Sequence, residues 1–242
     1  MANKMIFFNG PKGCGKNTLI DHIRCSDWVD ISCKLPLYSL VQSMFNVDGK
    51  TFWKIYLDRT LKELPSSEFR VCLSHRDLSD LVAIVGESSI DPDDTNRDFS
   101  FEMDTYKVTL NLSVREAMIY VSEVIIKPRW GEDYFGKARM VYVMIDEEDV
   151  IYYDDSAASF SGDALELNAA IEHFGQENCL LVRIYGRGSF EGDSRGYIPN
   201  GVVGNVMEIT NDGDLKSFLD TSSERLYTWL GNIGMGRGTE NE

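Results

Sequence analysis

The sequence has few of the residues that build metal sites and disulfide frameworks. Its three histidines stand far apart in a chain of 242 residues. Its five cysteines are odd in number and form no Cys-x-x-Cys pair. A metal–thiolate site or a disulfide framework is therefore not expected, and the cysteine usage favours a reducing compartment such as the cytoplasm.

Long apolar runs and an excess of cations are also missing. No run approaches the length needed to span a bilayer, and the first residues lack a signal-peptide pattern, so no membrane partner is expected. The chain has 24 Lys and Arg against 39 Asp and Glu, a formal net charge of −15. This charge repels nucleic acid, and a nucleotide enzyme with this balance must gather its cations locally.

The apolar residues that are present form short runs typical of buried strands. Four runs without polar alternation and a fifth, more amphipathic run predict parallel strands, and helical patterns fall between them. The expected strands are Met5–Phe8, Val29–Cys33, Val150–Tyr153, Cys179–Tyr185 and Val206–Thr210. The expected helices are Leu19–Cys25, Ser113–Lys127 (ending at Pro128), Tyr134–Met144, Ala164–Phe174 and Asp214–Leu230. This alternation predicts an α/β fold, a three-layer sandwich around a parallel five-stranded sheet.

One long segment interrupts the alternation. Residues 36–112 are too many for a simple crossover, so we expect an inserted region within a single domain that spans 1–242. It contains helix-like pieces and an acidic segment, 87–104, whose carboxylates lack the spacing of an EF-hand and favour a solvated loop. The glycine-rich tail, 231–242, is expected to be flexible.

The first apolar run leads into a glycine loop. The sequence from Gly10 to Lys16 reads Gly-Pro-Lys-Gly-Cys-Gly-Lys, with the Gly-x4-Gly-Lys spacing of a nucleotide phosphate-binding loop. Glycines at 10, 13 and 15 allow backbone N–H groups to converge on phosphate oxygens, and the following helix adds its positive N-terminal end. Lys16 is expected to reach the β- and γ-phosphates.

The position after Lys16 departs from the general motif. Asn17 stands where a Ser or Thr hydroxyl usually ligates Mg²⁺, and its amide oxygen is a weaker candidate ligand. Thr18 is a further candidate for phosphate binding. Gly10, Gly13, Gly15, Lys16, Asn17 and Thr18 therefore form the predicted ATP site.

Carboxylates end one of the predicted strands. Asp154 and Asp155 follow Tyr153, at the carboxyl end of a strand, where open parallel sheets bind ligands. We expect Asp155 to orient a substrate or a metal-bound water, and Asp154 to be a candidate Mg²⁺ ligand.

Arginines and glycines follow the fourth predicted strand. Arg187 and Arg195 lie in a glycine-rich segment, 187–201, that predicts a short closing lid. Arginines in such a lid stabilise charge on a transferring phosphoryl group, so both are candidate catalytic residues. By itself the segment is equally compatible with a surface loop.

The order of these features resembles that of nucleoside monophosphate kinases, and more narrowly that of bacteriophage deoxynucleoside monophosphate kinases. The similarity spans most of the chain. It lies in residues 10–18, 57–59, 113–118, 133–137, 154–156, 190–195 and 209–213. The resemblance implies a P-loop kinase that transfers the γ-phosphoryl of ATP to a deoxynucleoside monophosphate with Mg²⁺, in the cytoplasm of a host cell, as a possible homodimer.

The resemblance also implies roles for individual residues. The acceptor-side positions are Lys12, Leu37, Tyr38, Arg59, Arg115, Phe135 and Asp155. Relatives often have an acidic or amide residue at the position of Asn17. Some relatives carry an Arg soon after the strand-end Asp, where this chain has Ser156-Ala157-Ala158, so Arg187 or Arg195 is expected to supply that charge.

Two other functions are compatible with the sequence. One is a P-loop kinase of another small molecule, such as a cofactor precursor. The other is a nucleotide-binding module that has no acceptor and catalyses hydrolysis at most. The arginines of 187–201 argue against the module, since binding alone needs no such clamp.

Overall fold

A computed structural model describes residues 3–86, 90, 98–102, 106–143, 149–160, 162–191 and 195–231. The chain divides into two compact units, which are described separately. The sheet unit comprises Met1–Cys33 and Phe135–Glu242, and the inserted unit comprises Lys34–Tyr134. The acidic segment 87–104 lies largely outside the described residues, as does the tail from residue 232.

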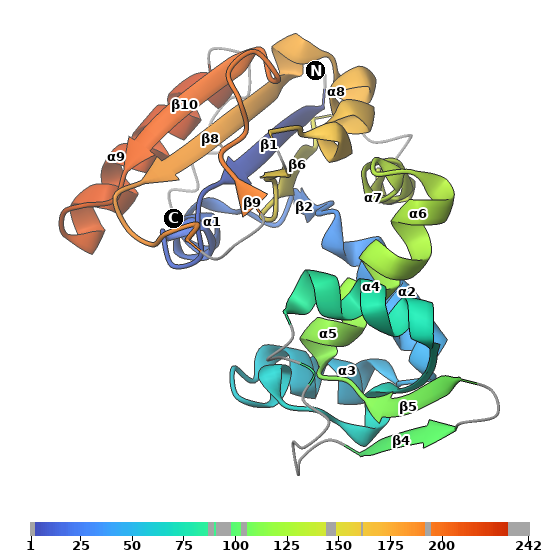
Figure 1. Cartoon of the computed structure of the whole chain (residues 1–242). Coiled ribbons are helices and arrows are strands. Elements are labelled where there is room, and N and C mark those ends of the chain that lie inside the picture. Colours follow the sequence, from blue (N-terminus) through green and yellow to red (C-terminus); the bar gives the residue numbers. More distant parts are fainter. Residues whose placement is uncertain are drawn as a thin grey trace. The chain divides into compact units, whose positions relative to one another are not determined.

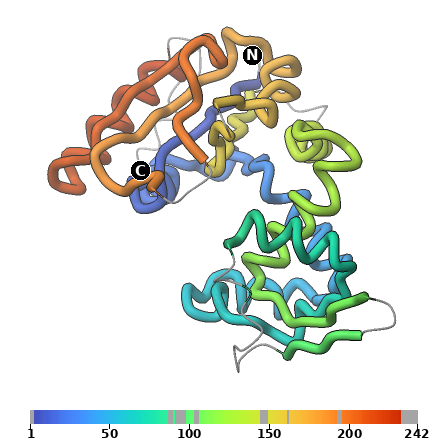
Figure 2. The backbone as a smooth tube through the Cα atoms, in the orientation of Figure 1, coloured from blue at the N-terminus to red at the C-terminus, as the bar shows by residue number. Residues whose placement is uncertain are grey.

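The sheet unit is built on five parallel strands (Figures 1 and 2). They are β1 (Lys4–Asn9), β2 (Trp28–Asp30), β6 (Ile151–Asp154), β8 (Cys179–Tyr185) and β10 (Asn205–Thr210). Their order is β10-β8-β1-β6-β2, so the glycine-loop strand β1 is central, between β8 and β6. The predicted α/β class and the parallel five-stranded sheet are confirmed. The second strand is shorter than expected, ending at Asp30.

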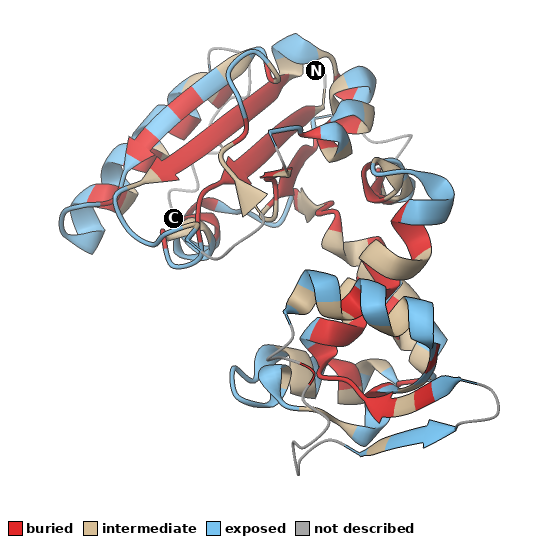
Figure 3. Ribbon diagram, viewed as in Figure 1, coloured by how far each residue is buried: buried red, intermediate tan, exposed pale blue. Residues whose placement is uncertain are grey.

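Both faces of this sheet are covered by helices, because its strands are apolar on both sides. Alternate residues of β1 enter different cores: Ile6 and Phe8 face one side, Met5 and Phe7 the other. The first core includes residues of α1 (Lys16–Ile23) and α9 (Leu215–Gly231). The second includes residues of α8 (Asn168–Phe174). Buried strands therefore lie between helices whose outer faces are exposed, as Figure 3 shows.

Short elements complete the sheet unit. Helix α7 (Tyr134–Ala138) continues as a 3-10 turn, Arg139–Tyr142, so the helical pattern predicted from Tyr134 ends two residues early. A 3-10 turn, Leu165–Leu167, precedes α8. Two-residue strands β7 (Ser159–Phe160) and β9 (Arg195–Gly196) pair antiparallel.

The inserted unit combines helices with a three-stranded antiparallel sheet. Its strands are β3 (Arg70–Ser74), β4 (Phe99–Glu102) and β5 (Lys107–Asn111), in the order β3-β5-β4. Its helices are α2 (Lys34–Phe45), α3 (Gly49–Leu57), α4 (His75–Val85), α5 (Val114–Ile119) and α6 (Lys127–Trp130). This unit includes residues 36–112 and extends beyond them to Tyr134.

The helix predicted after Ser113 runs past Pro128. Ser113 and Glu116 form the expected capping box at its start. A π-helical stretch, Tyr120–Ile126, then joins α5 to α6, which ends at Trp130. The prediction of an end at Pro128 is wrong, because the proline lies in the first turn of α6, where its missing N–H costs no helical hydrogen bond.

Within the described residues, no helix is both long enough and apolar enough to cross a membrane.

Candidate functional site

The glycine loop joins the central strand to the first helix of the sheet unit. It runs from Gly10 to Gly15 between β1 and α1. Gly13 and Gly15 have φ angles of 84° and 103°, which only glycine adopts at little cost. Gly15 is the N-cap of α1 and has no side chain to cap the helix, and no acidic residue lies in the first turn. The N–H groups at this helix start suit an anion.

Lys16 is oriented by the loop that it follows. Its ammonium group donates hydrogen bonds to the carbonyl oxygens of Gly10 and, over 3.1 Å, Pro11. The sulfur of Cys14 lies 3.7 Å from the same nitrogen. These contacts hold a half-buried cation against the loop, while Asn17 and Thr18 are exposed at the helix start. The structure thus brings together the residues of the predicted ATP site.

A second loop supports the glycine loop from the C-terminal part of the chain. Asn211 follows β10, is 3% exposed, and donates from Nδ2 to the Cys14 carbonyl over 2.9 Å. A Cβ atom on Gly15 would lie 2.7 Å from that nitrogen and 3.3 Å from the ring of Phe218. Gly15 is therefore required by close packing as well as by its backbone angle.

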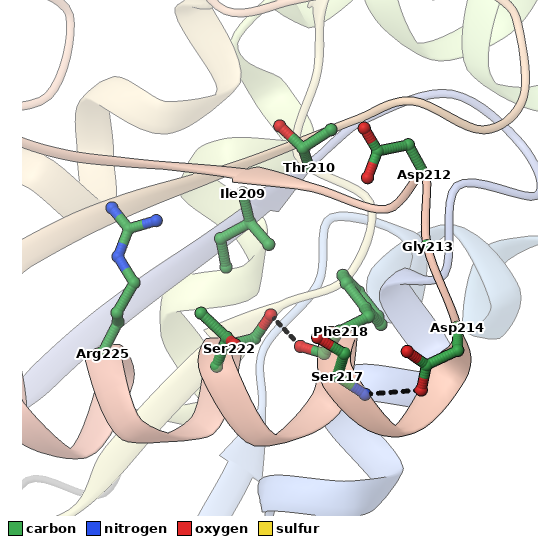
Figure 4. A pocket seen from close by; sticks show the side chains of 10 residues that line it. Ile209, Thr210, Asp212, Gly213, Asp214, Ser217, Phe218, Ser222 and Arg225 are labelled. Carbon is green, nitrogen blue, oxygen red and sulfur yellow. Dashed lines mark hydrogen bonds between the residues drawn. The ribbon is translucent and has the colours of Figure 1, made fainter.

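A pocket of about 260 Å³ adjoins this second loop. It lies between the end of β10 and the first half of α9, as Figure 4 shows. Phe218 lines the pocket and also packs near Gly15, so the pocket shares a wall with the glycine loop. Its lining residues are Ile209, Thr210, Asp212, Gly213, Asp214, Ser217, Phe218, Thr221, Ser222 and Arg225.

Carboxylates gather at the carboxyl ends of β2 and β6, which are neighbours in the sheet. The pKa of Asp30 is raised to about 6, first by burial and then by the charges of Asp155 and Asp154, against a lowering by Ser32. The Ser32 N–H donates to Asp30 over 2.8 Å. Asp155 is half-buried beside this group. These carboxylates lie where the ligands of parallel sheets bind.

Asp154 is fully buried and its oxygens are engaged. One oxygen accepts from the guanidinium of Arg139, which is also completely buried. The other accepts from the Ser156 N–H and hydroxyl, over 2.8 and 2.7 Å. Arg139 also donates to the Glu166 carbonyl over 3.0 Å. Asp154 thus joins a buried ion pair, and its geometry does not suit a direct Mg²⁺ ligand.

Burial also keeps the nearby Cys33 neutral. Desolvation raises the pKa of its thiol well above the usual value, more strongly than the charge of Arg139 lowers it. Within the described residues, no group of three His, Cys, Asp or Glu side chains could hold a metal ion. Asn17 is exposed at the start of α1, which is compatible with the weak ligand expected at that position.

The segment after β8 contacts the glycine loop. Lys12 and Ser189 form an antiparallel backbone bridge. Gly186 and Gly188 have positive φ angles, and a Cβ atom on Gly188 would overlap the Lys12 carbonyl. The guanidinium of Arg187 donates to the Gly213 carbonyl over 2.8 Å. Arg195 lies in β9, paired with Phe160.

The remaining acceptor-side residues lie in different units. Phe135 is buried in α7 of the sheet unit, which also contains Lys12 and Asp155. Leu37, Tyr38, Arg59 and Arg115 lie in the inserted unit. There, Arg59 is exposed and Arg115 lies 3.6 Å from a carboxylate oxygen of Glu63.

Tyr38 belongs to an aromatic cluster of the inserted unit. Its ring centroid lies 4.9 Å from that of Tyr56 and 5.0 Å from that of Trp53. Its hydroxyl donates to the Tyr56 hydroxyl over 2.7 Å. Tyr38 is 8% exposed, so in the inserted unit its ring is largely committed to this cluster.

Sequence reasoning missed three buried polar residues beside the glycine loop and strand ends. They are Asn9, Arg139 and Asn211. Asn9 had a weak signal, as a polar residue that ends an apolar strand directly before Gly10. Arg139 had none. Asn211 lies in the segment 209–213 of the resemblance, which gave it no role, because its partner Cys14 is set by the tertiary fold.

Comparison of the chain with protein-family models, curated proteins and solved structures finds no match.

Proposed function

We propose that the protein is an ATP-dependent kinase that phosphorylates deoxynucleoside monophosphates to diphosphates. The observation that carries the proposal is the glycine loop. Between a central strand and a helix, Gly13 and Gly15 have positive φ and Lys16 is held against the loop. This arrangement suits binding of a nucleotide's phosphates. The family identity, as a P-loop kinase, remains part of the proposal.

The proposed donor site uses the glycine loop and the start of α1. Backbone N–H groups from Gly13 to Thr18 bind the phosphates, and Lys16 neutralises charge on the β- and γ-phosphates. Asn17 is the residue of this chain that would hold Mg²⁺, which would neutralise charge on the phosphates. Asp154 is not assigned to the metal, because Arg139 and Ser156 engage its oxygens.

The proposed catalysis consists of positioning and charge stabilisation. Arg187 and Arg195 lie on the segment after β8 and supply positive charge to the transferring phosphoryl group. Asp155 orients the acceptor at the strand ends, and Lys12 and Phe135 contribute to the acceptor side. Leu37, Tyr38, Arg59 and Arg115 are the acceptor-side residues proposed from the inserted unit. No covalent intermediate is required.

The test is ADP production measured with ATP, Mg²⁺ and each of the four deoxynucleoside monophosphates. The proposal expects ADP release that depends on the acceptor, with a deoxynucleoside diphosphate as the second product. A parallel panel of small alcohols and other monophosphates tests the alternative kinase. If only such an acceptor is phosphorylated, the deoxynucleotide proposal is wrong. Nucleotide binding with no acceptor-dependent ADP would instead favour a binding module.

A further inference from the structure

The second half of the segment after β8 is bonded to the sheet unit at several points. This return arm, defined as Arg195–Asn200, begins with β9, which pairs with β7. The Ser159 hydroxyl donates to the Tyr197 carbonyl over 2.8 Å. The Tyr197 hydroxyl donates to the Ile184 carbonyl over 3.0 Å. The return arm is therefore fixed to both β7 and β8.

Ile198 is held at both of its backbone groups. Its N–H donates to the side-chain oxygen of Asn9 over 2.9 Å, and its carbonyl accepts from the guanidinium of Arg183. Asn9 and Arg183 are register partners on the adjacent strands β1 and β8. Ile198 is only 1% exposed, so these hydrogen bonds are made away from water. Leaving either backbone group unpaired there would be costly.

Asn9 connects three parts of the candidate site through one side chain. Besides accepting from Ile198, it donates from Nδ2 to the carbonyls of Ala157 and Gly196, over 2.9 and 3.2 Å. Ala157 lies two residues after Asp155, and Gly196 directly follows Arg195. Asn9 itself directly precedes Gly10 and has no exposed surface.

The first half of the same segment is held differently. In the outgoing arm, Gly186–Glu191, residues 186–189 are all exposed. Its contacts to the rest of the sheet unit include the Lys12–Ser189 bridge and the exposed Arg187–Gly213 hydrogen bond. Exposed hydrogen bonds of this kind open at low cost. The two arms therefore differ in how firmly they are attached.

We infer that Asn9 is a positioning residue that fixes Arg195 and Asp155 relative to the glycine loop. Because Asn9 holds the backbone beside each residue, it sets their spacing without contacting a substrate. The catalytic consequence rests on the proposed function. The anchoring of the return arm does not.

The anchoring is tested by amide hydrogen exchange of the ligand-free protein. Asn9→Leu keeps a similar volume and removes all three hydrogen bonds. We expect the Ile198 amide to exchange at least about tenfold faster in this variant, since local opening becomes easier. The matched control is Asn205→Leu. It removes bonds to three backbone carbonyls, those of Gln176, Glu177 and Cys179, at the amino end of β10.

A milder variant keeps the test decisive if Asn9→Leu does not fold. Ser159→Ala removes one hydrogen bond, the one to the Tyr197 carbonyl, and leaves Asn9 in place. The Ile198 amide should then exchange a few-fold faster, since one net hydrogen bond corresponds to roughly a fivefold change. Unchanged exchange at Ile198 in the folded variants overturns the anchoring.

The positioning role is tested by steady-state kinetics of the full chain with ATP and its acceptor. Asn9→Leu should lower kcat about tenfold or more while the KM for ATP changes less than about threefold, as for a misplaced catalytic group. Asn205→Leu should leave both constants unchanged. Faster exchange with unchanged kcat overturns the positioning role, as do equal kcat losses in the two variants. If the wild-type protein has no acceptor-dependent activity, the proposed function fails, and the exchange experiment still decides the anchoring.

Discussion

The side-chain amide of Asn211 donates a hydrogen bond to the carbonyl of Cys14, 197 positions earlier in the chain, over 2.9 Å. It ties the loop before α9 to the glycine loop. The Asn211 backbone N–H also donates to the Tyr185 carbonyl over 2.9 Å, which anchors the same loop to β8. The position of the glycine loop thus depends on a residue far away in sequence.

Replacing Asn211 by Leu should weaken nucleotide binding more than it weakens folding. The side-chain oxygen of Asn211 is buried and has no hydrogen-bond partner in the described structure, so removing it offsets part of the lost bond. We expect the dissociation constant for ATP, measured by calorimetric titration, to rise about tenfold, with little change in the unfolding midpoint. Unchanged ATP affinity would contradict this role.

Replacing Lys16 by Ala should abolish most activity without unfolding the protein. The contacts described for the ammonium group include the carbonyl oxygens of Gly10 and Pro11 and the sulfur of Cys14, all within the loop. Turnover should fall at least about 100-fold, because charge on the phosphates is no longer neutralised. ADP production measures the loss, and circular dichroism measures the fold.

The control for Lys16→Ala is Lys216→Ala. The Lys216 side chain is exposed and pairs with Asp220 on the surface of α9, in the same unit. Lys216→Ala changes the net charge by the same amount as Lys16→Ala and should leave turnover unchanged. Near-normal turnover of Lys16→Ala would refute the assignment of the glycine loop as the donor site.

The sheet could be predicted because its strands are buried on both faces. Runs such as Met5–Phe8 and Cys179–Tyr185 carry apolar side chains on both sides, a pattern that depends on few other residues. The glycine loop could be predicted for a similar reason, since its glycine spacing and its special backbone angles belong to six consecutive residues. Elements that satisfy their requirements locally are the ones a sequence reveals.

The rest depends on distant partners. In the inserted unit, β3 and β4 pair only through β5, and their exposed residues gave no continuous apolar run. Asn9 takes its role from Ile198, 189 positions away. Arg139 resembles an ordinary surface cation in sequence. Its complete burial is explained by distant partners, the buried carboxylate of Asp154 and the carbonyl of Glu166. No local pattern encodes such pairings.

Breaking the buried Arg139–Asp154 pair should strongly destabilise the sheet unit. Arg139→Met leaves the Asp154 carboxylate buried without its cation, which costs about 3–5 kcal/mol of unfolding free energy. Adding Asp154→Asn to this variant removes the buried, unpaired carboxylate charge. The double variant should therefore recover part of the lost unfolding free energy. Urea denaturation of the wild type, both single variants and the double variant measures the coupling.

The comparison for this pair is the exposed Arg24–Asp21 pair, at 3.0 Å. Arg24→Met removes the same side-chain charge, but water already screens it, so the unfolding free energy should change far less. Equal losses of unfolding free energy in Arg24→Met and Arg139→Met would show that burial does not determine how much stability is lost when an ion pair is broken.

Asp30 should make stability fall as the pH rises through the acidic range. Its pKa is about 6 in the folded protein against the usual 3.8, mainly because burial disfavours the carboxylate. Between these values the folded state binds more protons than the unfolded state, so stability decreases from about pH 4 to pH 6 and is then level. Asp30→Asn keeps an acceptor for the Ser32 N–H and removes this dependence.

Relative to wild type, Asp30→Asn should therefore gain stability between pH 4 and pH 7.5. The full pKa shift of Asp30 corresponds to about 3 kcal/mol of unfolding free energy. We expect a gain of about 1–2 kcal/mol, because the side chain is partly exposed to water. Asp48→Asn provides a control of opposite sign. Hydrogen bonds from Thr51 lower the pKa of Asp48 below its usual 3.8, so its carboxylate contributes stability that is present above the unfolded-state pKa and is lost as the pH falls toward the lower folded-state pKa. Urea denaturation at pH 7.5 should thus show Asp30→Asn more stable than wild type and Asp48→Asn less stable. Shifts in the same direction would refute the burial of the Asp30 charge as the cause.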